Sequence, residues 1–171
     1  YQILYLPSTR RRLAIEVVSQ LLQNPQLELV VVTGRNENLH EALVRAGFDH
    51  APHVRLIGWT DQMPELLASS HLFCGKPGGA IVQEAIAAQT PFLVTHVVPG
   101  QEEGNAALLE RIGAGRILKD GARELPVAIE EVFANDGKQW KEWKRNLLGY
   151  SRPDAARRIA RFLMDFCEKP S

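Results

Sequence analysis

Residues 73–84 read Phe-Cys-Gly-Lys-Pro-Gly-Gly-Ala-Ile-Val-Gln-Glu, and this stretch determines how the rest of the chain is interpreted. The apolar residues 71–74 predict the end of a buried strand, and residues 80–88 predict a helix after a glycine turn. A strand, a glycine turn and a helix point free backbone N–H groups at an anion, and Pro77 suits the start of a helix. Glu84 lies a little over one turn into that helix, where its carboxylate can accept hydrogen bonds from vicinal sugar hydroxyls. The stretch therefore predicts a nucleotide site, with the diphosphate at the turn and the ribose at Glu84.

Two better-known phosphate motifs do not fit this stretch. In a P-loop the lysine follows the glycines and precedes Ser or Thr, whereas Lys76 comes before them. The dinucleotide fingerprint needs three spaced glycines after the first strand and an acid near the end of the next one. Here Gly78 and Gly79 are adjacent, and the acid is on the same helix. An ordinary strand-to-helix turn with a surface glutamate explains this stretch equally well when it is taken alone.

The composition indicates one globular domain and argues against nucleic acid as a partner. The chain has 171 residues, with 20 basic and 20 acidic side chains and a formal net charge of zero. Its two cysteines, Cys74 and Cys167, are too few for a disulfide framework or a zinc site and are compatible with a reducing cytosol. No apolar run is long enough to cross a bilayer, and no signal peptide opens the chain. The strand-like start of the chain is what we expect of a fragment, or of a domain cut from a larger protein.

Apolar strand-like runs alternate with amphipathic, helix-like segments along the chain. This alternation predicts the α/β class, with a Rossmann-like parallel sheet and helices on both faces. The run at 27–32 is continuously apolar and β-branched, as expected of a strand buried on both faces. We expect one domain over 1–150 and a C-terminal helix in 151–171. Strands are expected at 2–6, 27–32, 54–57, 72–74, 92–95 and 116–118, and helices at 13–22, 38–46, 63–69, 80–88, 102–112, 125–133, 140–148 and 154–166.

In a parallel sheet ligands bind outside the carboxyl ends of the strands, which collects the candidate residues at one edge. The second informative stretch is 99–105, Pro-Gly-Gln-Glu-Glu-Gly-Asn, where Gln101 and Glu102 offer donors and acceptors for sugar hydroxyls. Acidic residues also simply favour a helix N-terminus, so a structural role is equally compatible with this stretch. The segments expected at the edge are 8–12, 34–36, 58–63, 75–79 and 96–103.

Three further residues at this edge have both a binding and a structural interpretation. Arg35 follows the second strand and can pair with a phosphate or cover the sheet edge. Trp59 can stack on a base, although a buried aromatic side chain is as compatible with the sequence. Met63 suits the core better than a ligand contact. The basic run 10–12 can hold a phosphate or an anionic membrane surface, but a solvated loop fits three arginines better.

With both stretches in hand, the chain resembles the C-terminal donor-binding domain of the GT-B glycosyltransferases. The resemblance is strongest to the group of monogalactosyldiacylglycerol synthases, processive diacylglycerol glucosyltransferases and the lipid II GlcNAc transferase. It is carried by four stretches, in matching order across most of 30–117: Thr-Gly-Arg-Asn at 33–36, Gly58-Trp59 with Met63, Lys-Pro-Gly-Gly at 76–79 with Glu84-Ala85, and the motif at 99–105.

The resemblance implies a role for each matching residue in binding a UDP-sugar. The diphosphate would lie against Pro77, Gly78, Gly79 and Ala80, the ribose against Glu84, and the sugar hydroxyls against Gln101 and Glu102. The loop with Trp59 and Met63 would lie beside the uracil, and Arg35 near the phosphates. The resemblance also implies an inverting transferase without a bound metal or other cofactor, at work in the cytoplasm and able to associate peripherally with the membrane.

Two departures from the family pattern limit what the resemblance implies. The family's glycine-rich loop after the first strand is replaced by Pro-Ser-Thr-Arg-Arg-Arg at 7–12, which puts phosphate or acceptor contacts from that loop in doubt. In the family, the half that binds the lipid acceptor and supplies the general base precedes this domain, and we expect it to lie outside these 171 residues. We therefore assign no catalytic residue, although Asp61, His96 and Glu103 have suitable chemistry.

Two functions of different classes follow from these observations. The first is the donor half of an enzyme that moves a hexose from a UDP-sugar to a lipid acceptor, with a diacylglycerol-type acceptor preferred because the second motif has Gln-Glu rather than paired glutamines. In this case the C-terminal helix is expected to pack toward the missing N-terminal domain. The alternative is a non-catalytic UDP-sugar-binding subunit that needs a separate acceptor-binding partner chain. A sugar epimerase of the same fold ranks below both.

Overall fold

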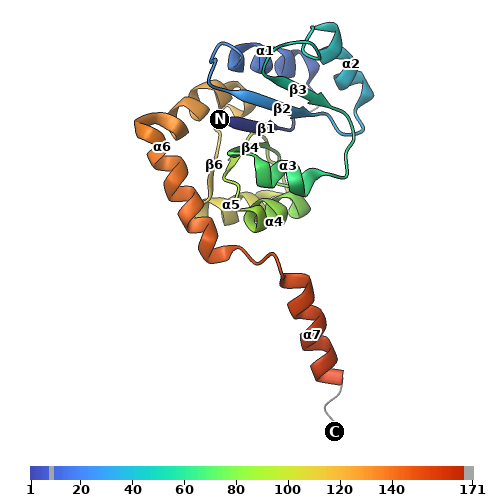
Figure 1. Ribbon diagram of the computed structural model, residues 1–171, viewed down its shortest axis with the longest axis vertical. Coiled ribbons are helices and arrows are strands. Elements are labelled where there is room, and N and C mark those ends of the chain that lie inside the picture. Colours follow the sequence, from blue (N-terminus) through green and yellow to red (C-terminus); the bar gives the residue numbers. More distant parts are fainter. Residues whose placement is uncertain (8–9, 168–171) are drawn as a thin grey trace.

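The protein, described here by a computed structural model of residues 1–7 and 10–167, is built on one parallel sheet (Figure 1). The strand order is β3-β2-β1-β4-β5-β6, and every neighbouring pair is parallel. The chain therefore runs outward from β1 in one direction and then returns to β4 and runs outward in the other. The strands are β1 (Gln2–Tyr5), β2 (Glu28–Val32), β3 (Val54–Ile57), β4 (Leu72–Gly75), β5 (Phe92–Val94) and β6 (Gly115–Ile117). The predicted α/β class and parallel sheet are confirmed.

The helices follow the predicted segments, and two details are informative. α1 begins before the predicted segment, so Arg11 and Arg12 lie in its first turn and not in a loop. The two helices predicted at 125–133 and 140–148 are the two parts of α6, and residues 134–137 between them have backbone angles that are not helical. The helices are α1 (Arg11–Leu21), α2 (Glu37–Arg45), α3 (Met63–Ser69), α4 (Gly79–Ala88), α5 (Glu103–Arg111), the short 3-10 helix η1 (Gly121–Glu124), α6 (Leu125–Tyr150) and α7 (Ala155–Cys167).

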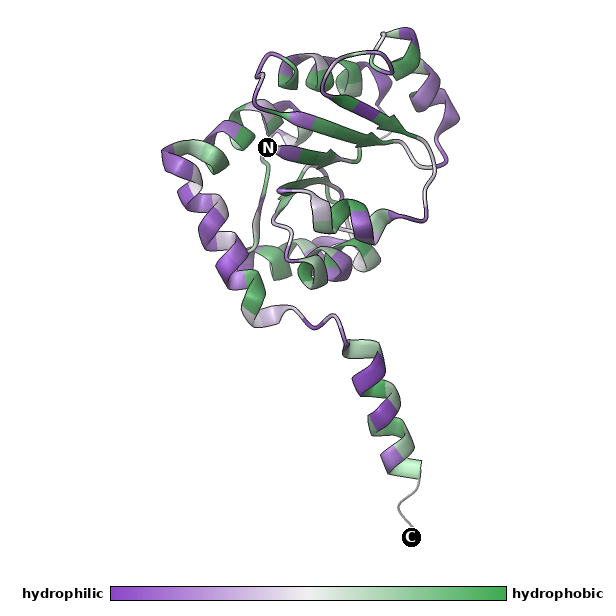
Figure 2. Cartoon of the chain, in the orientation of Figure 1, coloured by the Kyte–Doolittle hydropathy of each residue, from purple (hydrophilic) through white to green (hydrophobic). Residues whose placement is uncertain are grey.

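Side chains alternate between the two faces of the sheet, and each face has its own apolar core. Ile3 and Tyr5 of β1 pack with α1, α2 and the first part of α6, whereas Leu4 between them packs with α3, α4 and α5. The continuous apolar run of β2 divides in the same way, because Val31 faces the first core and Val30 and Val32 face the second. Figure 2 shows the central strands as mainly hydrophobic, with hydrophilic residues on the outer sides of the helices. Burial on both faces therefore explains why β2 carries no polar alternation.

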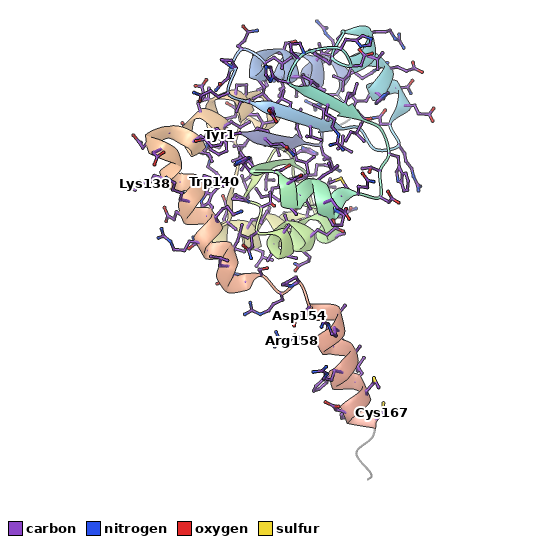
Figure 3. The ribbon with its side chains drawn as sticks, in the orientation of Figure 1. Tyr1, Lys138, Trp140, Asp154, Arg158 and Cys167 are labelled. Carbon is purple, nitrogen blue, oxygen red and sulfur yellow. The ribbon has the colours of Figure 1, made fainter. Side chains whose placement is uncertain are left out.

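The C-terminal helix α7 extends away from this body (Figures 1 and 3). Its side chains are exposed throughout, including Ile159, Phe162 and Phe166, which are 60%, 67% and 70% exposed. These three residues recur at helical spacing and form an apolar stripe, whereas Arg157 and Arg161 lie on the other side of the helix and Arg158 lies at the edge of the stripe. No helix in the part of the chain that the structure describes is both long and apolar enough to cross a membrane.

Candidate functional site

The candidate site lies where the carboxyl ends of β1 and β4 meet. β1 and β4 are neighbours in the sheet but far apart in the chain, and the connections after them lead to opposite sides of the sheet. Such a switch in connection direction leaves a crevice at the carboxyl edge, where ligands bind in open α/β sheets. The structure brings the predicted site residues to this edge, on the loops and helices that follow β2, β3, β4 and β5.

The turn between β4 and α4 presents unpaired backbone donors at this edge. Gly78 is the N-cap of α4 and has no side chain to cap it, and the first bond of the helix runs from the N–H of Val82 to the carbonyl of Gly78. The N–H groups of Gly79, Ala80 and Ile81 therefore have no partner within the helix. Pro77 is buried before the N-cap, whereas Gly79 and Ala80 are exposed. This end of α4 can receive an anion, both through its N–H groups and through the positive end of the helix dipole.

The glycines of this turn differ in what the fold requires of them. A Cβ on Gly75 would lie 2.8 Å from the ring of Phe73, so the strand end itself needs glycine there. A Cβ on Gly79 would meet nothing closer than 3.8 Å, at the Nδ2 atom of Asn105, and Gly79 does not have a positive φ angle. The same 3.8 Å clearance, to Ile81, holds for Gly78. The protein therefore has room for a methyl group at 78 and 79.

Glu84 lies farther along α4 on the same side as Ala80, four residues and about 6 Å along the axis from it. Its side chain is half-buried. Among the residues that the structure describes, its carboxylate has neither a hydrogen bond nor an ion pair. The acceptor that the sequence predicts for ribose hydroxyls is thus held in the middle of α4, without a partner among the described residues.

The turn between β5 and α5 is stabilised by its own acidic residues. An Oε2 atom of Glu102 accepts a hydrogen bond from the N–H of Val98 at 2.8 Å, and Oε1 of Glu103 accepts one from the N–H of Gly100 at 2.6 Å. The bond from Gly100 is the main reason why the pKa of Glu103 lies below its usual value. Gln101 between these partners is exposed. Glu102 therefore holds its loop with one carboxylate oxygen, and Gln101 is free to reach a ligand.

The two turns form one structural unit. The amide Nδ2 of Asn105 donates a hydrogen bond to the carbonyl of Pro77 at 3.0 Å, and the ammonium of Lys76 lies 4.0 Å from Oε1 of Glu102. Each contact joins the turn after β4 to the turn after β5. The sequence placed both motifs at the same edge but did not identify Asn105 as the residue that connects them. A motif residue that binds backbone in another motif leaves no periodic signal in the sequence.

Replacing Asn105 with alanine is expected to lower the free energy of unfolding by about 1 kcal/mol, because a partly buried hydrogen bond contributes about that much. Urea denaturation monitored by circular dichroism measures the difference. Asn38→Ala is the matched control, since Asn38 is an exposed residue of α2, and it should change stability by less than about 0.5 kcal/mol. Equal stabilities of the two variants would show that the link between the turns does not support the fold.

Arg35 and Trp59 meet at the β2 and β3 end of the same edge. The guanidinium carbon of Arg35 lies 5.8 Å from the centre of the Trp59 ring, within the range of a cation–π contact. Trp59 is 60% exposed, so the interpretation of Trp59 as a buried aromatic residue is wrong. Met63, the first residue of α3, is half-buried and packs against the second core. Arg35 and Trp59 together offer a flat, cationic surface on which a planar ring can stack.

A cavity of about 760 Å³ lies along the carboxyl edge beside these turns. Its wall reaches from Thr33 and Asn36 after β2, past Lys76 and His96, to the loop after β6. The sequence predicted no site residue after β6. The run at 116–118 has only three residues of mixed polarity, so it does not show clearly where a strand ends. Lys119 and Arg123, which line the cavity from that loop, were therefore missed. Of the expected edge segment 8–12, Ser8 and Thr9 lie outside the described residues.

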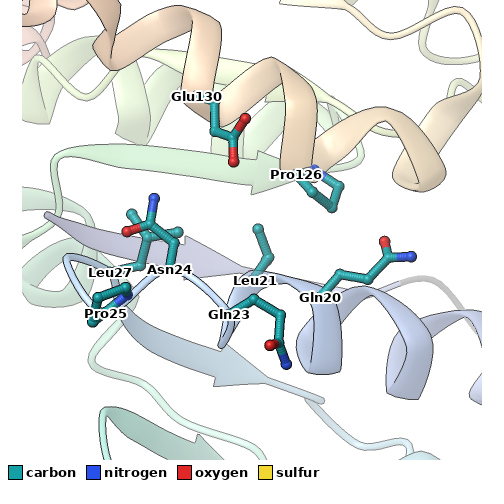
Figure 4. A pocket seen from close by; sticks show the side chains of 8 residues that line it. All are labelled: Gln20, Leu21, Gln23, Asn24, Pro25, Leu27, Pro126 and Glu130. Carbon is teal, nitrogen blue, oxygen red and sulfur yellow. The ribbon is translucent and has the colours of Figure 1, made fainter.

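Neither the pocket beside the start of α6 nor any cluster of metal-binding side chains in the described residues offers a better candidate site. A pocket of about 250 Å³ between the start of α6 and the loop before β2 is lined mainly by amide and proline side chains (Figure 4). That loop precedes β2, so this pocket lies toward the amino ends of the strands. Nowhere in residues 1–7 and 10–167 do three His, Cys, Asp or Glu side chains gather as they would around a metal ion.

Comparison with known proteins gives a family match over most of the chain. Residues 5–135 match the family model described as "Glycosyl transferases group 1". A processive diacylglycerol beta-glucosyltransferase of Staphylococcus carnosus (strain TM300) is 38% identical over 121 residues, which cover 70% of this chain and 30% of the relative. The enzyme of the same name from Bacillus thuringiensis (strain Al Hakam) is 29% identical over 150 residues, or 88% of this chain and 38% of the relative. The chain therefore spans well under half the length of these curated relatives.

Solved structures of low sequence identity share the fold. MurG of Acinetobacter baumannii aligns with a TM-score of 0.70 at 15% identity, over 96% of this chain and 49% of that one. A UDP-GlcNAc 2-epimerase from Neisseria meningitidis aligns with a TM-score of 0.68 at 16% identity, over 96% of this chain and 43% of that one. At these identities the likeness is one of fold, and it confirms the Rossmann-like architecture predicted from the sequence.

Proposed function

The chain belongs to the group 1 glycosyl transferases, and we propose that it is the donor-binding domain of an inverting enzyme that moves a hexose from a UDP-sugar to a lipid acceptor. The resemblance to a C-terminal GT-B domain is confirmed by the family match and the shared fold. The proposal of a UDP-sugar donor rests mainly on the part of the site at the start of α4. There, free N–H groups, two glycines that the fold does not require and a Glu84 carboxylate without a partner among the described residues follow one another along the helix.

We assign the parts of the donor along the carboxyl edge in the order of the residues. The uracil lies at Trp59, with Met63 beside it, and Arg35 lies near the phosphates. The diphosphate lies at Pro77, Gly78, Gly79 and Ala80, and the ribose at Glu84. The sugar hydroxyls reach Gln101 and the second oxygen of Glu102. A neighbour of this fold is described as bound to UDP-GlcNAc, which makes a uridine nucleotide compatible with the architecture.

The chemistry that this domain contributes is stabilisation of the leaving diphosphate. Negative charge develops on the diphosphate as the bond to the sugar breaks, and the preorganised N–H groups of α4 face that charge. We propose that they perform this work without a metal ion. No residue of this chain is assigned as the general base, which the proposal places on the acceptor-binding half of the protein.

A diacylglycerol-type acceptor and an inverting reaction are supported by the relatives. The curated relatives are diacylglycerol beta-glucosyltransferases. A beta-linked product is what one inverting displacement on an alpha-linked nucleotide sugar gives. The same lipid acceptor would place the protein at a membrane surface, as a peripheral protein on the cytoplasmic side.

A thermal-shift titration of this chain tests the proposal directly. A ligand that binds only the folded state at a hundredfold excess over its Kd stabilises by about 2.7 kcal/mol, which corresponds to about 5–10 °C for a domain of this size. UDP, UDP-glucose, UDP-galactose and UDP-GlcNAc should raise the melting temperature, and the ranking of the sugars identifies the donor. ADP and NAD are the controls. An equal rise with ADP, or no rise with any uridine nucleotide, would contradict the assignment.

The alternative function, a non-catalytic UDP-sugar-binding subunit, predicts the same titration result. It differs in where the acceptor-binding half is encoded. An open reading frame that extends upstream of this chain by a domain of similar size would exclude the subunit. A separate partner chain that restores transfer when mixed with this one would support it.

We further propose that α7 packs toward the acceptor-binding domain, as the sequence led us to expect for 151–171. Ile159, Phe162 and Phe166 are 60–70% exposed, and a contiguous exposed apolar stripe of this kind marks an interaction surface. Trypsin should therefore cut at Arg157, Arg158 or Arg161 rapidly in this chain and slowly in a protein that also contains the acceptor-binding domain. Equally rapid cleavage in both would contradict the packing and leave the lipid surface as the partner of the stripe.

A further inference from the structure

The cavity at the carboxyl edge has an excess of positive charge. Four of its lining side chains are cationic, Arg10, Lys76, Lys119 and Arg123, and one, Asp120, is acidic. The chain as a whole is balanced, with 20 basic and 20 acidic residues. The excess is therefore a local arrangement and does not follow from the overall composition. A cleft lined by one sign of charge concentrates counter-ions of the other sign.

Three of these cations have no counter-charge among the residues that the structure describes. Lys76 faces Glu102 at 4.0 Å, but within the described part of the chain no ion pair joins a carboxylate to Arg10, Lys119 or Arg123. The nearby acid Glu124 is already engaged. Its Oε1 atom lies 3.9 Å from Arg116, and its Oε2 atom accepts a hydrogen bond from the N–H of Asp120 at 3.2 Å.

The backbone fixes the loop that carries Lys119 and Arg123. Gly121 has a φ angle of +60°, and a Cβ there would lie 2.7 Å from the carbonyl oxygen of Thr95, so the loop packs closely against the end of β5. The helix η1 that follows packs against α1, whose N-cap is Arg10. Two elements that meet in space, but are distant in sequence, thus present their cations to one cavity.

We propose that Arg10, Lys119 and Arg123 form a second anion-binding site, separate from the donor turns, that takes a phosphate monoester or diester. Guanidinium groups match phosphate oxygens two at a time, and a lysine ammonium adds a point charge. The site rests on the cavity and its charges and not on the proposed donor. Its phosphate can come from an anionic lipid headgroup or from a soluble phosphate compound, and the test separates these sources.

The probe is inorganic pyrophosphate, titrated calorimetrically at low salt into this chain saturated with UDP. The test variant is Lys119→Gln/Arg123→Gln. The control variant is Lys138→Gln/Arg145→Gln, which removes the same charge from exposed positions on α6 (Lys138 in Figure 3). We expect the test variant to lose at least tenfold in pyrophosphate affinity and less than twofold in UDP affinity, and the control variant to change neither by twofold.

Two results would overturn the second site. One is unchanged pyrophosphate binding by the test variant. The other is a parallel loss of UDP affinity, which would make the loop part of the donor site. If UDP binds to no form of the chain, the proposed donor function fails, whereas a pyrophosphate affinity that falls only in the test variant still supports the second site.

Sedimentation with phosphatidylcholine vesicles, with and without phosphatidylglycerol, identifies the source of the phosphate. Binding to the anionic vesicles that the test variant loses and pyrophosphate competes away assigns the site to a lipid headgroup. Pyrophosphate binding without vesicle binding assigns it to a soluble phosphate compound. Vesicle binding that both variants retain, with unchanged pyrophosphate affinity, overturns the proposal.

Discussion

Glu84→Ala is expected to weaken the binding of UDP by about 10- to 150-fold. A hydrogen bond to a charged group contributes about 1.5–3 kcal/mol, and each 1.4 kcal/mol is a factor of ten in affinity. The side chain is half-buried on α4, one turn beyond the exposed N–H groups, and among the described residues its carboxylate has no other partner. The substitution therefore removes a contact with the ligand and no contact within the protein, so the melting temperature of the unliganded chain should change little.

The nucleotide itself can be varied to show which contact is lost. Glu84→Ala should bind UDP and 2′-deoxy-UDP with similar affinity, whereas the unmodified chain should prefer UDP, because removing either partner removes the same bond. Gln83→Ala is the control, since Gln83 is an exposed neighbour on the same helix. An unchanged Kd for UDP in Glu84→Ala, measured by calorimetry, would disprove the ribose contact.

The fold was predictable because its main signals are local. The continuous apolar run at 27–32 predicts a strand buried on both faces, and in the structure Val31 packs in one core and Val30 and Val32 in the other. The glycine turn after β4 predicts the start of α4 to within one residue. Where the signal is weak, the prediction is less complete. The short segment at β6 was identified, but the loop after it, with two cations at the cavity, was not.

The site was predictable by position but not by contact. Parallel topology collects Arg35, Trp59, Glu84 and Gln101 at one edge from sequence order alone. The bond from Asn105 to Pro77 and the approach of Lys76 to Glu102 depend on how two loops pack, and helical or strand periodicity contains no such information. The exposure of Trp59 likewise depends on what the rest of the chain leaves uncovered.

Gly79→Ala is expected to weaken the binding of UDP without lowering the stability of the fold. Alanine is favoured over glycine in a helix by about 0.5–1 kcal/mol, Gly79 is the first residue of α4, and the new methyl group would meet no atom closer than 3.8 Å. The melting temperature should therefore stay the same or rise. The affinity for UDP should fall at least about tenfold, because the methyl group occupies the space through which the diphosphate approaches the N–H groups.

Gly75→Ala is the contrasting variant, since its methyl group would lie 2.8 Å from the ring of Phe73 and should lower stability. Thermal unfolding and UDP calorimetry on both variants distinguish two reasons for a glycine at the same turn. Replacing a glycine that the fold requires lowers the stability of the protein. Replacing a glycine that the ligand requires lowers the affinity for UDP while the fold is retained. If Gly79→Ala binds UDP as tightly as the unmodified chain, the diphosphate does not approach α4 at this residue, and the placement of the donor along the edge must be revised.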